Sequence, residues 1–273
     1  MAEARRSPAS LRWRARTGPS LCALLLLAGA GYAFDARAIV DEIQVYTDDL
    51  DARGESSLEL HVNTTPSGRT TPDYDGDLPP KPGARVTPEF SWGLGNDMDW
   101  GLYLPTASDG HGNFYLGGAK VRVKWLPVRG REGEGGWYFG VNNELSDLDK
   151  KFSESQWNDE VRVIGGYRGR GWMIGMNPIF EWALSPGFRG SPDVTLAWKA
   201  AYDVVPGFAL GAEYYDDIGT LANQLPRDQQ SRTLYGVVDI ERKSWSLNFG
   251  IGHGLTAATD DWTVKAIFGF SFD

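Results

Sequence analysis

The sequence has very little cysteine and histidine: Cys22 is its single cysteine, and three histidines occur in 273 residues. A disulfide framework and cysteine-based zinc sites are therefore excluded for the chain after Cys22. After the N-terminal region, no apolar run reaches the roughly 20 residues that a membrane-spanning helix needs. Basic residues are also in deficit, with 27 Lys and Arg against 36 Asp and Glu. This acidic balance argues against nucleic acid as a partner.

The first 38 residues have the three parts of a signal peptide. Arginines between residues 5 and 16 precede an apolar stretch over residues 21–33, and Ala36-Arg37-Ala38 supplies a small-x-small cleavage pattern. We therefore expect residues 1–38 to be removed on export and the mature chain to begin at Ile39. Removal of six Arg and two acidic residues lowers the formal charge from −9 to −13.

What the sequence does contain is aromatic residues, glycine and strict alternation. In GAKVRVKWLP, Val121 and Val123 lie on one face, and Lys120, Arg122 and Lys124 lie on the other. This two-residue period is that of a β-strand with one apolar and one charged face. In a soluble β protein the apolar face meets a protein core, whereas in an outer-membrane barrel it meets lipid and the charged face lines the lumen.

Alternating segments bounded by turn residues predict twelve strands. They are Ser57–Thr64, Arg85–Leu94, Asp97–Leu104, Tyr115–Leu126, Gly136–Leu145, Glu160–Tyr167, Gly171–Trp182, Pro192–Tyr202, Gly207–Tyr215, Thr233–Glu241, Ser244–Gly252 and Asp261–Phe272. Most have the length that a tilted strand needs to cross a bilayer. Pro88 and Pro178 cannot donate a ladder hydrogen bond, so we expect a bulge or a strand end at each.

The connections between these strands alternate in length, which is typical of outer-membrane barrels with short periplasmic turns and long external loops. Pro127–Gly135 departs from this rule, because it should be short and is not. Amphipathic aromatic residues cluster beside the short turns, as expected at a membrane interface. This predicted girdle consists of Trp100, Trp125, Trp137, Tyr167, Trp172, Tyr202, Phe208 and Trp245. The prediction is an all-β fold, an antiparallel transmembrane β-barrel of about twelve strands.

Two resemblances to known families support this fold class. The final stretch VKAIFGFSFD places Phe268, Phe270 and Phe272 on one face and resembles the closing strand of bacterial outer-membrane β-barrels, although Asp273 follows the last aromatic. That resemblance implies an assembly signal read by the barrel-assembly machinery. The stretches DEIQVYTDDLDARGESSLELHVNTTPSGR and RVTPEFSWGLGNDMDWGLYLPT resemble a poorly characterised outer-membrane family linked by name to phenol and aromatic-compound degradation. This second resemblance implies transport but carries no defined site residues.

The same alternation sends a nearly balanced set of charged residues into the lumen. The predicted lumen-lining residues are Lys120, Arg122, Lys124, Glu59, Glu89, Glu144, Arg162, Glu181, Lys199, Glu213, Asp239 and Lys265, with Arg85, Asp99 and Glu160 in the same register. Glu144 is the expected partner of the basic strand. Two pictures stay open. The charges can form opposing walls of a water-filled constriction, or they can pair and fill the barrel.

Residues 39–56 form an acidic N-terminal segment ahead of the barrel, which we expect over residues 57–273. A charge run of this kind is most often a solvated tail, here on the periplasmic side. The alternative is that the segment folds into the lumen and meets the basic residues of the strand Tyr115–Leu126.

Catalysis and metal binding have weak signals in this sequence. His111 and His253 are flanked by glycines in expected loops, and no G-x-S-x-G motif accompanies Ser108 or any other serine. Asp109, His111 and Asp260 match no recognised metal-ligand spacing. We therefore expect no catalytic site, no metal and no cofactor.

These observations favour a channel or transporter-like barrel in the cell outer membrane that passes small solutes, with aromatic or hydrophobic ones included. The expected partners are outer-membrane lipids, the barrel-assembly machinery and the solute. Two alternatives stay open: a lipid-modifying enzyme of the phospholipase or lipid A deacylase type, and a structural or adhesive barrel acting through its long loops.

Overall fold

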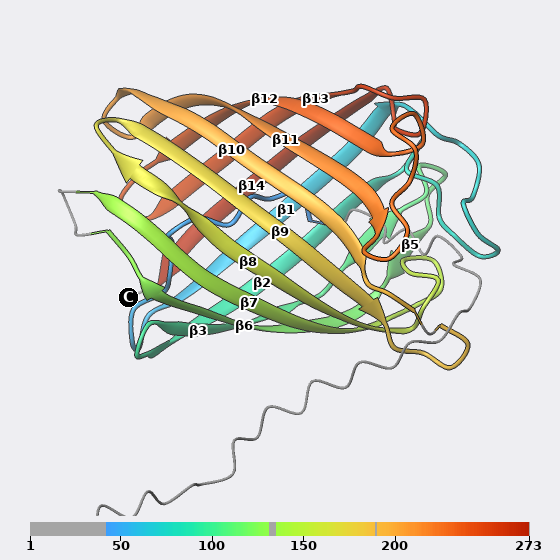
Figure 1. Ribbon diagram of the computed structural model, residues 1–273, viewed down its shortest axis with the longest axis horizontal. Helices are drawn as coiled ribbons and strands as arrows, with labels where there is room; N and C mark the ends of the chain where they lie inside the picture. Colours follow the sequence, from blue (N-terminus) through green and yellow to red (C-terminus); the bar gives the residue numbers. More distant parts are fainter. Residues whose placement is uncertain (1–41, 131–134, 189, 273) are drawn as a thin grey trace, which may run out of the picture. The chain divides into compact units, whose positions relative to one another are not determined.

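The computed structural model describes residues 42–130, 135–188 and 190–272, and the expected signal peptide lies outside them. Twelve antiparallel strands form a closed barrel, because β1 pairs with β14 on one side and with β2 on the other (Figure 1). The barrel strands are β1 Ser56–Ser67, β2 Ala84–Gly95, β3 Met98–Tyr103, β6 Gly118–Val128, β7 Gly136–Leu148, β8 Trp157–Gly169, β9 Trp172–Ala183, β10 Asp193–Val205, β11 Phe208–Thr220, β12 Ser231–Glu241, β13 Trp245–Gly254 and β14 Trp262–Phe272. The predicted fold class is confirmed.

Alternation along each strand explains why the sheet closes. On β6, Val121 and Trp125 are exposed on the outside, whereas Arg122 between them is buried in the interior. Every strand therefore presents one apolar outer face, and closure leaves no unpaired backbone edge beneath that face. No α-helix in the described ranges is long and apolar enough to cross a membrane.

The two ends of the barrel differ in their connections, as the sequence predicts. The β8–β9 hairpin turns through Arg170 and Gly171, whose φ angles of 55° and 79° suit a tight two-residue turn. Val205 and Phe208 flank a similar two-residue turn between β10 and β11. These hairpins lie at the left end of Figure 1, and the longer connections, such as residues 68–83, lie at the right end. We call these the short-turn end and the long-loop end.

A short hairpin was not predicted from the sequence. Strand β3 ends at Tyr103, and β4 (Thr106–Ser108) continues beside β2 and pairs with β5 (Phe114–Leu116). This change of strand occurs opposite Pro88, whose carbonyl oxygen accepts a hydrogen bond from the Leu104 amide.

The second proline inside a predicted strand also marks an irregularity. The β8–β9 register passes from Arg162↔Ile179 directly to Gly165↔Met176, across Pro178, with no shift of register. Pro178 leaves a gap in the β8–β9 ladder because it has no N–H to donate, but β9 continues through it in register. Strand β2 likewise continues through Pro88 in register with β1, so the expected bulge or strand end is absent from β2 and β9 and that expectation is wrong.

Candidate functional site

The segment that precedes β1 lies inside the barrel (Figure 1). Ile43, Val45 and Tyr46 are 4–6% exposed, and they pack against residues of the barrel wall. The prediction of a solvated periplasmic tail is therefore wrong for residues 42–52, which we call the lumen segment. The alternative placement fits, since Lys124 Nζ lies 5.5 Å from the Tyr46 ring centroid.

Side chains of the wall hold the lumen segment through its backbone. The Asn177 side-chain amide accepts a hydrogen bond from Tyr46 N at 2.6 Å and donates one to Tyr46 O at 3.0 Å. Lys265 Nζ donates to Ile43 O at 2.9 Å, and Arg162 Nη1 donates to Gln44 O at 3.2 Å. The backbone N–H and C=O groups of an extended segment need hydrogen-bond partners, and these contacts replace the water that the lumen segment loses on burial.

The Tyr46 side chain is fixed at both ends. Its hydroxyl lies 2.6 Å from the Tyr103 hydroxyl, and the Arg162 guanidinium lies 4.2 Å from its ring centroid. A cation over an aromatic face is attracted by the ring quadrupole. Tyr46 is therefore the best-anchored side chain of the lumen segment among those described.

A buried ion network surrounds Arg122. Arg122 Nη2 lies 2.6 Å from Glu89 Oε1, and Nη1 contacts Asp99. Lys124 Nζ lies 3.3 Å from the same Asp99, whereas Glu144, the expected partner of this strand, lies 3.2 Å from Lys120. Because Glu89 contacts Arg122 directly, the two do not form the separated opposing walls that the sequence allowed.

A second network occupies the opposite side of the lumen. Glu213 contacts Lys265, lies 3.4 Å from Lys199 Nζ, and accepts a hydrogen bond from Tyr215. Lys199 Nζ also lies 2.9 Å from Asp239 Oδ1. Glu213 and Lys265 are almost fully buried, so their ion pair compensates charges that burial would otherwise leave without water.

The remaining predicted lumen-lining residues also face the interior. Arg85 is buried and donates to Leu78 O, and Arg162 joins Glu160 and Glu42. Glu59 accepts a hydrogen bond from Gln44 of the lumen segment, and Glu181 lines a cavity described below.

Beside the charged residues Asp99, Lys124 and Asp239, the short-turn half of the lumen holds a cluster of apolar side chains around Tyr46. The apolar residues are Leu126, Tyr138, Ile164, Met173, Ala201 and Ala209. Inward-facing apolar residues are a departure from a polar lumen, and they close this half of the barrel against water.

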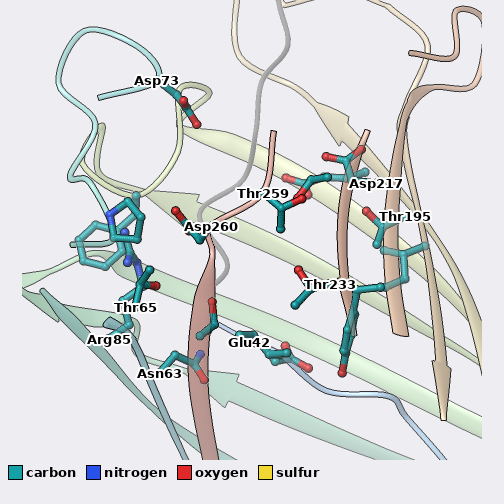
Figure 2. Close-up of a pocket in the computed structure, with 18 of the residues that line it drawn as sticks. Glu42, Asn63, Thr65, Asp73, Arg85, Thr195, Asp217, Thr233, Thr259 and Asp260 are labelled. Atoms are coloured by element: carbon teal, nitrogen blue, oxygen red, sulfur yellow. The ribbon is translucent and has the colours of Figure 1, made fainter. Parts of the chain in front are cut away.

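The long-loop half contains a cavity of about 660 Å³ (Figure 2). Glu42, Ile43 and Gln44 of the lumen segment line it, together with strand residues and the loops around Asp73 and Asp260. Among its described lining residues are ten carboxylates and four basic groups. The acids are Glu42, Asp73, Asp77, Glu144, Glu160, Glu181, Asp193, Asp217, Asp260 and Asp261, and the bases are Arg69, Arg85, Lys120 and Arg162.

The three histidines occupy separate places. His61 is fully buried, with Nε2 at 3.2 Å from Glu89 and 3.6 Å from Glu59, and this trio is the one group of three potential metal ligands among the described residues. Arg122 already contacts Glu89 there. His253 packs against Trp262 at the long-loop end, with ring centroids 4.7 Å apart and the ring planes tilted by 34°.

The loop histidine His111 belongs to a turn. Asp109 accepts hydrogen bonds from the Asn113 side chain and from the amides of His111 and Asn113, which lower the pKa of Asp109 to about 2. Asp260 instead accepts a hydrogen bond from the Arg69 amide, so it does not join Asp109 and His111 in the described structure.

The predicted girdle residues lie on the outer face near the short turns. Trp137 is 72% exposed and packs edge-on against Tyr167, with ring centroids 5.3 Å apart. Trp172 and Tyr202 are similarly paired at 5.0 Å. Trp100 stacks on Trp92, which the sequence analysis did not include, and Trp125, Phe208 and Trp245 complete the set.

No protein-family model matches this chain, and no curated protein matches it. Among solved structures, an outer membrane channel from Pseudomonas putida F1 has a TM-score of 0.57 at 12% identity, covering 84% of this chain and 100% of that chain. The KdgM porin has a TM-score of 0.52 at 10% identity, covering 80% and 99%. KdgM has also been solved in complex with disordered oligogalacturonate, with a TM-score of 0.51 at 10% identity, covering the same shares of both chains. These likenesses establish the barrel fold.

Proposed function

We propose that this chain is an outer-membrane channel for small solutes whose passage is closed by its own lumen segment. The apolar outer face and its aromatic girdle support insertion in a bilayer, because tryptophan and tyrosine favour the membrane–water interface. The fold likeness to an outer membrane channel and a porin supports the same placement.

The observation that carries this proposal is the cavity in the long-loop half of the barrel. Its volume of about 660 Å³ is that of a small-molecule site, and residues 42–44 of the lumen segment form part of its lining. Wall side chains such as those of Asn177 and Lys265 hold the backbone of the lumen segment. Its displacement would join the cavity to the short-turn end.

The nature of the solute is a separate part of the proposal. The oligogalacturonate of the KdgM complex is polyanionic, and we do not transfer it to a cavity that is lined by ten carboxylates. The sequence resemblance points instead to small aromatic solutes, and we keep these as candidates. Flux of phenol and of a neutral sugar into proteoliposomes would compare the two classes.

We propose that the chain is not a lipid hydrolase. The His111 amide is part of a turn with Asp109, and His253 Nδ1 lies 2.9 Å from Asp261 O. Neither contact supplies a serine nucleophile with a base. Fatty-acid release from lipid A or phospholipid by the purified protein would contradict this assignment.

Planar-bilayer recording tests the channel proposal. Asn177→Ala removes both hydrogen bonds to the Tyr46 backbone. We therefore expect open-channel events at least about tenfold more frequent than in the wild-type protein, because the closed state loses about 1.4 kcal/mol of free energy relative to the open state. Asn143→Ala is the matched control, since Asn143 faces outward and contacts Asp159. Absence of current in the wild type and in Asn177→Ala would contradict the proposal.

A further inference from the structure

We infer that the barrel wall forms a binding site for an extended peptide, which the lumen segment occupies in the closed state. A peptide solute takes the same place when the lumen segment leaves it. This inference deepens the proposed channel function by naming the class of its solutes, and the passage of the peptide rests on that function. The site lies in the barrel interior beside residues 43–46 (Figure 1).

Four hydrogen bonds join wall side chains to backbone atoms of residues 43–46. The Asn177 amide accepts one bond from the Tyr46 N–H and donates one to the Tyr46 carbonyl oxygen. Lys265 donates to the carbonyl oxygen three residues before Tyr46 at 2.9 Å, and Arg162 donates to the one two residues before it at 3.2 Å. Because every residue has these backbone atoms, the contacts recognise a polypeptide without regard to its sequence.

Side chains of the lumen segment alternate between two sides of the wall, as those of an extended peptide do. Ile43 packs against apolar residues of β12, and Val45 packs against apolar residues of β9 and β10. Gln44 donates instead to Glu59 of β1 at 3.1 Å, and the Tyr46 hydroxyl lies 2.6 Å from a tyrosine hydroxyl of β3. Backbone hydrogen bonds combined with separate places for alternate side chains are the features of a peptide-binding site.

The place of the Tyr46 side chain makes the site selective for an aromatic residue. Its ring lies in the apolar cluster with Leu126 and Ile164, and the Arg162 guanidinium lies 4.2 Å from its centroid. Both the apolar surroundings and the cation over the ring favour an aromatic side chain over an aliphatic one. The preferred peptide therefore has an aromatic residue, with apolar residues one and three positions before it.

Two arginines add a preference for acidic side chains near the ends of the same stretch. Arg162 Nη1 lies 3.4 Å from Glu42 Oε1, and Arg168 Nη2 lies 2.7 Å from Asp48 Oδ1. Arg168 Nε also donates to the Asp48 carboxylate at 2.9 Å. An arginine that binds a carboxylate through two nitrogen atoms recognises its shape as well as its charge.

The lumen segment competes with any free peptide for this site. Because it is joined to β1, its local concentration is on the order of millimolar. A free peptide therefore binds the wild-type protein weakly, and substitutions that weaken the lumen segment uncover the site. Ile43→Ser and Tyr46→Ala remove two apolar side chains that are 5% and 6% exposed, and they leave the wall unchanged.

The test is the binding of a fluorescently labelled peptide with the sequence of residues 42–51 to the full mature protein in detergent. Fluorescence anisotropy measures the dissociation constant. We expect the Ile43→Ser/Tyr46→Ala variant to bind the peptide at least about tenfold more tightly than the wild type, because its own segment competes less well.

A second peptide, methylated at the nitrogen that corresponds to Tyr46 N, tests the position of the site. It should bind about fivefold more weakly or worse, since the Asn177 side chain loses a donor. Addition of Asn177→Ala to the double variant should abolish the difference between the two peptides, as in a double-mutant cycle. Addition of Asn143→Ala is the matched control and should preserve the difference, because Asn143 faces outward and contacts Asp159.

Each outcome distinguishes the two proposals. Absence of peptide binding, or equal binding by the wild type and the double variant, would overturn the peptide site. A methylation effect that persists after Asn177→Ala would overturn its assignment to this wall. Peptide binding as expected, without current or peptide uptake into proteoliposomes in any form, would overturn the channel function and leave the peptide site intact. Heat-modifiable gel mobility verifies folding, and Tyr46→Ala alone replaces a double variant that does not fold.

Discussion

Arg122 bridges two acids in the barrel interior. Its side chain is 5% exposed, and those of its partners Glu89 and Asp99 are 4% and 1% exposed. Tyr103 also accepts a hydrogen bond from Arg122 Nε at 2.9 Å. Removal of one partner from a buried ion pair leaves an uncompensated charge, which costs far more than the net value of the intact pair.

We therefore expect Arg122→Met to lower the free energy of unfolding by about 3–5 kcal/mol. Urea-induced unfolding of the protein in lipid vesicles, followed by tryptophan fluorescence, measures the change. Arg129→Met is the matched control, because Arg129 and its partner Asp97 are about 40% and 45% exposed and an exposed pair contributes less than about 1 kcal/mol. Equal losses in the two variants would contradict the assigned role of Arg122.

The sequence could not predict which interior charges form ion pairs with one another. Alternation assigns Lys120, Arg122 and Lys124 to the interior without reference to any other strand. The register of the neighbouring strands puts Glu144 opposite Arg122 and Asp99 opposite Lys124. The side chains pair diagonally instead, so Arg122 contacts Glu89 and Asp99, and Glu144 lies beside Lys120. A single strand contains no information on that register.

At the scale of elements, strand β14 closes the barrel against β1. Phe268, Phe270 and Phe272 face outward, and the β1–β14 ladder extends to the pair Ser56↔Phe272. The C-terminal residues thus serve both as hydrogen-bond partners of β1 and as the expected signal for the assembly machinery. Loss of these residues exposes backbone groups that cost several kcal/mol each in hydrocarbon.

Removal of residues 268–273 should abolish assembly in the outer membrane. The measurement is the heat-modifiable mobility of the barrel in cell-envelope fractions. Removal of Asp273 alone is the control and should have no effect, since it retains all three aromatic residues. Normal assembly of the longer truncation would contradict the proposed signal.

Two elements escaped the sequence analysis for different reasons. The β4–β5 hairpin consists of three-residue strands, which are too short to show a period. The lumen segment does alternate, through Glu42, Ile43, Gln44 and Val45, but its acidic residues indicated a solvated tail. In this stretch the alternation predicts a buried face and the acidic charge predicts exposure to solvent, and the structure follows the alternation.

At the scale of the whole molecule, the lumen combines both pictures that the sequence allowed. The long-loop half holds the cavity, and the short-turn half holds the apolar cluster around Tyr46. A twelve-stranded barrel is wide enough for side chains to fill its short-turn half while its long-loop half holds a cavity that can contain water. Open and filled regions therefore coexist along one axis.

The exposed outer face leads to a prediction for the intact protein. Val121, Trp137, Ile174 and Leu210 are each 45% exposed or more, which is costly in water. Mature protein should therefore leave membranes only with detergent and precipitate when the detergent is removed. Sedimentation velocity measures this, and a monodisperse species in plain buffer would contradict membrane insertion.

The attachment of the lumen segment determines how it can move. It joins β1 through a turn at residues 52–55, where Glu55 N donates to Ala52 O at 2.9 Å and Gly54 N to Gly93 O at 3.3 Å. Under the proposed channel function, this turn keeps a displaced lumen segment close to the wall residues that hold it. Its return to the lumen would be an intramolecular step at millimolar effective concentration, and we expect the rate of closing to be independent of how many copies the membrane holds.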